Sequence, residues 1–466
     1  MNIIGQIDEK LIENNLINLK QIVFEVTEKC NLNCKYCGLS DLYQKHTIRG
    51  NKDLSFKKAQ LMIDYHLKTK DMKNLIIILT LSLLVIGACG DGRKKSTDKC
   101  ISIDVSKSYP KKELILQNFM DVEYISLETN YDFINQGIVM DIGEKFILVK
   151  NNVMDGNIFV YDRKGHALRI INRKGQGPEE YINFSSIILD EEKDEIFVND
   201  HHSSKIIVYD LIGNYKRSLK HKENTIYIPI YNFDKDYLIS FDANTQFYQL
   251  FNEERRKQSH FIVSKTDGSI FKEIAVPFKQ AKSTALFKYD ASNKLVGDAK
   301  ISFEPIIYDS GNWILVEPSA DTLFSYNNEY QIKPFITRMP SIQDMDPEVF
   351  LFPVIMTDRY YFMRSVKKDF NFETRNGFST IELLYDRQEK TIHEYAIYNE
   401  DFSLENPINM RIRTLNNEEI VFVYKYDVFN LLNNLKKGQL KGQLKEIAEK
   451  LDEEDNPVLM LVKHKK

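Results

Sequence analysis

Ile206-Ile-Val-Tyr-Asp210, followed by a turn that ends in Gly213, is the stretch of sequence that decides the fold. A second apolar run, Ile196-Phe-Val198, precedes it, and a short polar loop separates the two runs. Short apolar runs that are rich in Val, Ile and aromatic residues and bounded by polar turns are typical of buried strands. The stretch therefore predicts two paired strands closed by a tight turn.

Strand pairs of this kind recur along the second part of the chain at irregular intervals of about 50 residues, a spacing in the range of one propeller blade. The six predicted units contain Phe146–Val149 with Ile158–Asp162, Ile196–Val198 with Ile206–Asp210, Tyr237–Ser240 with Phe261–Ser264, Trp313–Val316 with Thr322–Tyr326, Tyr361–Met363 with Ile381–Asp386, and Ile420–Val423 with Val458–Val462. One four-stranded blade per unit predicts a mainly β fold, a six-bladed β-propeller over residues 100–466. The alternative is an array of β-sandwiches.

The two ends of this region fit a closed ring. Val122–Leu127 precedes the first unit, and we expect it to complete the last blade beside Val458–Val462. Closure of this kind removes exposed strand edges, which otherwise promote aggregation. Leu440, Leu444, Ile447 and Leu451 recur at helical spacing, which predicts an amphipathic helix that interrupts the sixth blade.

Several stretches of this region are similar to the six-bladed propeller lipoproteins of the NHL/TolB-like kind. They are Val122-Glu-Tyr-Ile-Ser-Leu-Glu-Thr129, Gly175-Gln-Gly-Pro-Glu-Glu-Tyr181, the unit from Asn199 to Asp210, and Asn456-Pro-Val-Leu459. The resemblance covers nearly all of residues 100–466 and implies the propeller fold and a surface location. It implies no particular reaction.

Residues 72–89 have the pattern of a secretory signal. A basic start at Met72-Lys73 leads into an apolar run, and the stretch ends in Ile86-Gly87-Ala88-Cys89. These last four residues resemble the lipobox of bacterial lipoproteins, in which the cysteine carries the lipid, so Cys89 is the predicted lipidation site. A buried core helix is the alternative. Residues 90–99 are polar and charged, which predicts a flexible tether.

Residues 1–71 have a different character. Cys30, Cys34 and Cys37 form a CxxxCxxC motif after a predicted strand, and thiolates at such spacing can hold an iron–sulfur cluster. This segment resembles the start of the radical SAM family, which implies a [4Fe–4S] cluster on these cysteines and S-adenosylmethionine as cofactor. The segment supplies one strand and one helix of a short α/β fragment, and the Gly-Gly-Glu stretch of the family is absent. We therefore expect cluster binding without catalysis; a zinc half-site or a chance cluster is the alternative.

Two further stretches of the propeller region are candidate sites. The Gly175–Tyr181 loop offers backbone amides to an anion, but a tight connection between blades is the favoured interpretation. His201-His202 suggests a metal site, but adjacent histidines in a loop rarely bind one ion together, so a surface pair is favoured. No nucleophile elbow, zinc-protease helix or phosphate-binding loop is present in the sequence.

The predicted function is that of a lipid-anchored binding module of the cell envelope, with a protein or a glycan as ligand at one propeller face. The formal net charge of −4 is mixed in sign along the chain, so nucleic acid is not an expected partner. The alternatives are an inactive radical SAM fragment, located in the cytoplasm if it is not exported, and a propeller lyase or hydrolase with a site in the channel. Iron–sulfur clusters and lipobox signals belong to different compartments, so the junction near Asp71-Met72 is interpreted as a fusion of two reading frames or a rearrangement.

Overall fold

The computed structural model describes residues 100–152, 155–246, 258–403, 407–410, 415 and 417–465. The chain divides into two compact units, Met1–Thr97 and Asp98–Lys466, and only the second contains described residues. Cys30, Cys34, Cys37 and Cys89 lie outside the described residues, as do the signal segment and the tether.

The first three sheets each have four antiparallel strands that follow one another in sequence. Sheet 1 contains β4 (Ile138–Ile142), β5 (Phe146–Lys150), β6 (Asn157–Asp162) and β7 (Ala167–Asn172). Sheet 2 contains β8 (Ser186–Asp190), β9 (Glu195–Asp200), β10 (Lys205–Asp210) and β11 (Tyr215–Lys220). Sheet 3 contains β12 (Tyr227–Asn232), β13 (Tyr237–Asp242), β14 (Gln258–Ser264) and β15 (Ile270–Ala275).

The next two sheets have the same core of four strands and gain a fifth. Sheet 4 contains β18 (Ile306–Asp309), β19 (Asn312–Leu315), β20 (Thr322–Asn327) and β21 (Ile332–Met339). Sheet 5 contains β22 (Val349–Met356), β23 (Tyr360–Lys367), β26 (Thr380–Asp386) and β27 (Thr391–Tyr398). The added strands are β1 (Ile101–Asp104) on β21 and β2 (Lys111–Ile115) on β27, both in parallel pairing.

These two parallel strands are not predicted by the sequence pattern. In both, burial varies along the strand, and each pairs through its backbone with a strand more than 200 positions further along the chain. The stretch from Ile101 to Ser126 thus runs along the outer edges of sheets 4, 5 and 6 in turn. It covers edges that would otherwise be open to a strand of another molecule.

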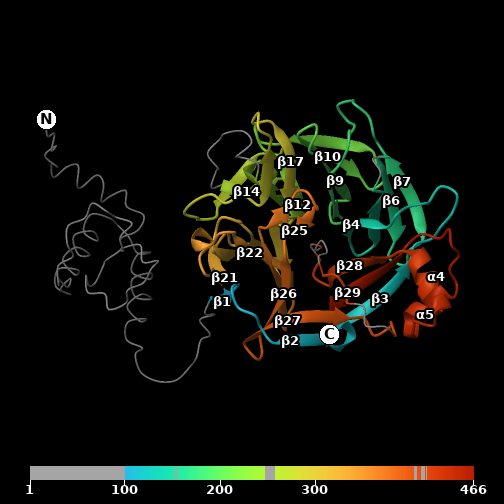
Figure 1. Cartoon of the computed structure of the whole chain (residues 1–466). Coiled ribbons are helices and arrows are strands. Elements are labelled where there is room, and N and C mark those ends of the chain that lie inside the picture. The colour runs from blue at the N-terminus through green and yellow to red at the C-terminus, as the bar shows by residue number, and fades with distance from the viewer. Residues whose placement is uncertain are drawn as a thin grey trace, which may run out of the picture. The chain divides into compact units, whose positions relative to one another are not determined.

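The sixth sheet confirms the predicted closure. Its described strands are β28 (Ile420–Tyr426), β29 (Val458–His464) and β3 (Met120–Ser126), in that order. β29 pairs with β3 in antiparallel register from Val458 opposite Ser126 to His464 opposite Met120. Figure 1 shows the six sheets arranged around one axis, with β3 next to β29.

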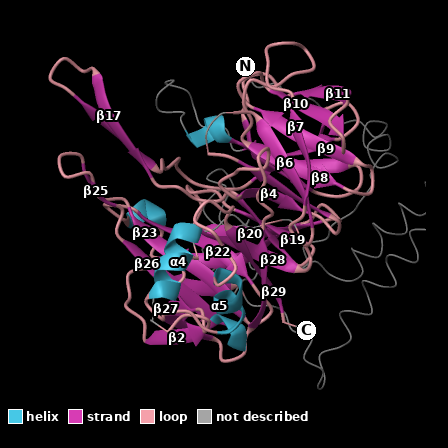
Figure 2. Cartoon of the chain, turned by 90° about the vertical axis from the view of Figure 1, so that its right-hand side faces the viewer, coloured by secondary structure: helices cyan, strands magenta, loops and turns pink. Residues whose placement is uncertain are grey.

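The innermost strands of neighbouring sheets pack side by side, as β4 does with β8 and β8 with β12. Strands alternate in direction, so in sheets 1 to 5 the loop between the first and second strands lies at one end, and the residues just before β28 of sheet 6 lie at the same end. We call this end the mouth face, and the opposite end the hairpin face. The hairpin face carries two inserted hairpins, β16 (Ala285–Tyr289) with β17 (Leu295–Lys300), and β24 (Phe370–Asn371) with β25 (Asn376–Gly377). Figure 2 shows β17 and β25 projecting from the same side.

Two helices interrupt the sixth sheet between β28 and β29, namely α4 (Val428–Lys436) and α5 (Gly442–Ala448). The predicted helix corresponds to α5, although it is shorter than the leucine spacing suggests, and α4 was not predicted. Leu431, Leu440 and Leu444 are buried and belong to the core cluster of sheets 5 and 6. In the part of the chain that the structure describes, no helix combines the length and the apolar character that crossing a membrane requires.

Candidate functional site

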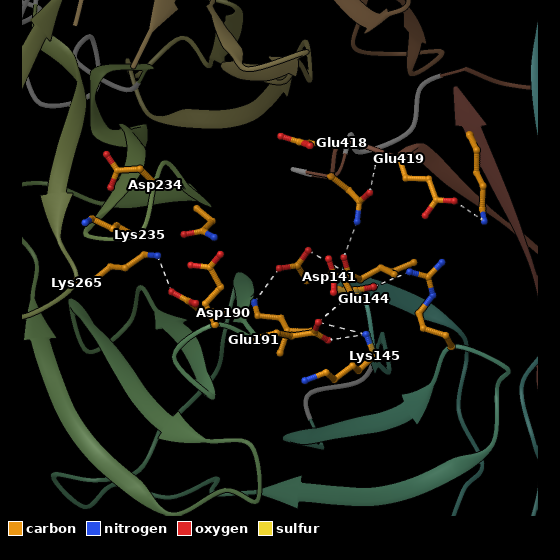
Figure 3. A pocket seen from close by; sticks show the side chains of 18 of the residues that line it. Asp141, Glu144, Lys145, Asp190, Glu191, Asp234, Lys235, Lys265, Glu418 and Glu419 are labelled. Atoms are coloured by element: carbon orange, nitrogen blue, oxygen red, sulfur yellow. Dashed lines mark hydrogen bonds and ion pairs between the residues drawn. The ribbon is translucent and has the colours of Figure 1, made fainter. Parts of the chain in front are cut away.

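A large cavity lies on the mouth face. Its volume is about 1090 Å³, and nine carboxylates and five cationic side chains line it. The lining residues come mainly from the ends of β4, β8 and β12, from the loops that follow these strands, and from Asn417–Glu419 before β28. Figure 3 shows that these side chains surround one open space. We call it the mouth cavity.

One position recurs at this face in all six sheets. It lies five residues before the second strand of sheets 1 to 3, three residues before the second strand of sheets 4 and 5, and three residues before β28, the first described strand of sheet 6. It bears a side-chain oxygen in every case. Its occupants are Asp141, Asp190, Asn232, Asp309, Thr357 and Asn417. Four of them, Asp141, Asp190, Asn232 and Asn417, line the mouth cavity. The sequence analysis did not recognise this position, although an alignment of the repeated units on their second strands contains the signal.

Several of these side chains join neighbouring sheets. The Asp141 carboxylate accepts the backbone N–H of Leu189 at 2.8 Å, which joins sheet 1 to sheet 2. The Asn417 amide donates to the carbonyl of Ile142 at 3.0 Å, which joins sheet 6 to sheet 1. Glu191 accepts the backbone N–H groups of residues 144–146 at 2.8 to 3.2 Å. These groups fix the shape of the cavity rim.

The floor of the cavity contains a buried ion pair between sheets 2 and 3. Lys265 Nζ lies 2.6 Å from Asp190 Oδ2, and their side chains are 1% and 5% exposed. Burial lowers the pKa of Lys265, and the Asp190 carboxylate opposes this effect. Lys265 also faces the ring of Phe197. The pair lies where charges are poorly hydrated, so each partner depends on the other.

Replacing Asp190 with Ala should therefore destabilise the fold by about 3–5 kcal/mol, because it leaves a buried ammonium without its carboxylate. Denaturant unfolding of the variant measures the change. The double variant Asp190→Leu/Lys265→Met should recover most of the loss. The exposed pair Lys436–Glu453, at 3.4 Å, is the matched control, and Glu453→Ala should cost less than about 1 kcal/mol. Equal costs for Asp190→Ala and Glu453→Ala would contradict the interpretation.

Carboxylates outnumber cationic side chains in this cavity, and some of the carboxylates have no partner among the described residues. Glu123 and Glu419 pair with Lys463 at 2.7 and 3.0 Å. Among the described residues, the carboxylates of Glu144, Glu192 and Glu418 have no hydrogen bond or ion pair. They come from sheets 1, 2 and 6, so their negative charge is spread around the mouth.

Asp309 extends the acidic character of the mouth face. Burial raises the pKa of its carboxyl to about 6; Arg387 opposes this rise, and Asp358 adds to it. Asp309 borders a small void next to Asn417 rather than the mouth cavity itself. Its carboxyl therefore keeps its proton to a higher pH than an exposed aspartate does.

The Gly175–Tyr181 loop is an inter-blade connection between β7 and β8. Its amides are used internally, since Gly175 N–H donates to the carbonyl of Tyr181 at 3.0 Å and Gly177 N–H to the Glu180 carboxylate at 2.8 Å. Tyr181 is fully buried, and its hydroxyl donates to the carbonyl of Gly156 at 2.7 Å. This use of the amides favours the structural interpretation of the loop over an anion site.

His201 and His202 lie in the loop between β9 and β10, on the hairpin face, with ring centroids 4.1 Å apart. Burial lowers the pKa of His201, and His202 is exposed. The described residues contain no group of three or more His, Cys, Asp or Glu side chains that could hold a metal ion. The two histidines thus lie in a loop between strands, where the sequence predicts them.

The family model described as 6-bladed beta-propeller matches residues 92–424 of the chain. The chain belongs to this 6-bladed beta-propeller family. The match begins within the predicted tether and ends in β28, so it covers the first five sheets and the start of the sixth. The expectation of a six-bladed propeller is thereby confirmed, and the sandwich array is excluded. No curated protein matches the sequence.

One solved structure supports the same fold for this member of the 6-bladed beta-propeller family. A Bacteroides fragilis protein classed as exported has a TM-score of 0.52 and 17% identity, over 79% of this chain and 100% of that one. A DUF4221 family member from Bacteroides vulgatus has a TM-score of 0.41 and 10% identity, over 75% and 99%. The virginiamycin B lyase from Staphylococcus aureus has a TM-score of 0.30 and 12% identity, over 59% and 88%. The last two scores are too low to carry an argument.

Proposed function

We propose that this chain is a lipid-anchored propeller of the bacterial cell envelope that binds a glycan at the mouth cavity. The observation that carries the proposal is the cavity itself, with a volume of about 1090 Å³ and an excess of carboxylates. Ligand sites are concave and contain a few well-placed polar groups, whereas protein partners usually need a broad surface. Surplus acceptors favour a ligand that donates many hydrogen bonds, and sugar hydroxyl groups do so.

The location in the envelope is supported by the Met72–Cys89 pattern and by the similar fold of a Bacteroides fragilis protein that is named as exported. The anchor would be the lipid on Cys89, and residues 90–99 would form the tether to β1. The cysteines Cys30, Cys34 and Cys37 would be removed with the signal, so a cluster on them, with or without S-adenosylmethionine, would have no part in the mature envelope protein.

The test is binding of the glucosamine hexamer, a sugar polymer with hydroxyl and ammonium donors, measured by calorimetry on the full chain in detergent. The triple variant Glu144→Gln/Glu192→Gln/Glu418→Gln should weaken binding at least about tenfold, because each lost charged hydrogen bond contributes about 1.5 kcal/mol or more. The control variant Glu373→Gln/Glu446→Gln/Glu454→Gln changes three exposed carboxylates that do not line the cavity. Equal affinities of all three proteins, or no binding by the wild type, would refute the proposal.

A further inference from the structure

Three aromatic rings form a continuous surface on the mouth face, between sheets 3 and 4. The rings of Tyr237 and Phe271 are 4.6 Å apart, and those of Phe271 and Tyr330 are 5.1 Å apart. Phe271 is 50% exposed, and the other two are half-buried. We call this surface the aromatic ledge. Phe233 connects it to the buried core, because its ring lies 6.0 Å from that of Tyr330 and 6.1 Å from that of Trp313.

Tyr330 occupies a backbone position that sheets 1 to 3 give to glycine and sheet 5 gives to Lys390. The turns between the third and fourth strands of sheets 1 to 3 contain Gly165, Gly213 and Gly268, with φ of 87°, 91° and 77°. Tyr330 has φ of 61° in the corresponding turn of sheet 4, and its N–H donates to the carbonyl of Asn327, as that of Gly165 does to Asp162. This conformation is costly for a bulky side chain. A strained residue that presents a ring at a surface points to function.

Polar groups surround the ledge. Asp234 lines the mouth cavity and accepts the N–H groups of Asp236 and Tyr237, so the ledge and the cavity are adjacent. Burial raises the pKa of the Tyr330 phenol, and the nearby carboxylate of Asp234 adds to this rise. Beneath the ledge, Tyr326 is 1% exposed, and its hydroxyl has no hydrogen-bond partner among the described residues.

The charges around the ledge distinguish between ligand classes. Lys272 Nζ lies 5.3 Å from the centre of the Tyr330 ring, and it donates to the Tyr330 carbonyl at 3.1 Å. Lys193 and Lys235 lie 3.7 and 4.0 Å from the Asp236 carboxylate. Lys272 already occupies the position that a cationic ligand would need over the Tyr330 ring, and two lysines neutralise the Asp236 carboxylate. A neutral ligand with apolar faces and hydroxyl edges is the best match.

We propose that the aromatic ledge is a subsite for a neutral saccharide, stacked on Phe271 and Tyr330 beside the carboxylates of Asp234 and Asp236. The C–H faces of a pyranose ring contact the rings, whose faces carry partial negative charge, while the sugar hydroxyls donate to the carboxylates. The subsite extends the glycan site of the mouth cavity outward and in this respect rests on the proposed function.

Cellohexaose, mannohexaose and acetylated chitohexaose are the probes, titrated into the full chain in detergent. At least one should bind, and Phe271→Ala should weaken its binding by about tenfold or more. Tyr330→Gly should weaken binding in the same way with the thermal midpoint retained, because glycine suits this turn. Phe429→Ala, which removes a ring 64% exposed on α4, is the control and should bind as the wild type does.

Absence of binding by all three probes, or unchanged affinity of both ledge variants, would overturn the subsite. A loss of affinity in Phe429→Ala equal to that in Phe271→Ala would also overturn it. If one of these outcomes occurs while the glucosamine hexamer still binds through Glu144, Glu192 and Glu418, only the proposal of a ledge subsite is refuted. If the glucosamine hexamer does not bind while a neutral hexasaccharide binds at the ledge, the proposal of a glycan site in the mouth cavity is refuted. The ledge is then a separate saccharide site.

Discussion

A chain that stops after Asp455 is expected to lose cooperative folding and to aggregate. The truncation removes β29, in which Val458, Leu459, Met460, Leu461 and Val462 are all fully buried. Burial of one such side chain contributes about 1.5–3 kcal/mol, so the loss is on the order of 10 kcal/mol. This is comparable with the whole stability of a typical domain, about 5–15 kcal/mol. The edges of β28 and β3 would also be exposed to other molecules.

Thermal unfolding and size-exclusion chromatography measure this effect. A chain that ends at His464 keeps all of β29 and is the matched control, which should behave as the full chain does. Deletion of residues 1–99 should also leave the thermal midpoint nearly unchanged, because it removes nothing from β1 onward. A soluble, monomeric product of the Asp455 truncation with an unchanged midpoint would rule out closure through β3 and β29.

The sequence was sufficient for the strands whose signals are local. The units with Tyr161-Asp162 and Tyr209-Asp210 combine a buried tyrosine with a turn that needs glycine at positive φ, as at Gly165 and Gly213. Such residues mark a buried strand and its turn within a few positions of the sequence, so each strand pair could be located independently of the others. The closing strand β3 was predicted because propeller closure demands a partner for Val458–Val462, and Val122–Leu127 was the apolar run available.

The remaining features depend on contacts between distant segments. β1 and β2 were missed because they are short edge strands held by backbone hydrogen bonds to β21 and β27. Such pairing requires no particular pattern of apolar side chains in β1 or β2. The mouth cavity was missed because its carboxylates come from loops that meet only when the ring closes. The aromatic ledge was missed because Tyr330 breaks the glycine pattern that identified the other turns.

The Cys89→Ala variant is expected to lose all labelling by a fatty-acid probe in living cells, whereas the wild type is labelled. The expected effect is complete because the lipobox resemblance assigns the lipid to a single thiol. Cys100→Ala is the matched control, since Cys100 is an exposed cysteine close by in sequence and should be dispensable. Equal labelling of the wild type and the Cys89→Ala variant would refute the assignment.

The intact mass of the protein purified from cell membranes tests most directly whether the working molecule is the exported propeller alone. We expect a mass that corresponds to a chain whose first residue is Cys89 with attached lipid. A mass that includes residues 1–88, or one without lipid, would contradict it.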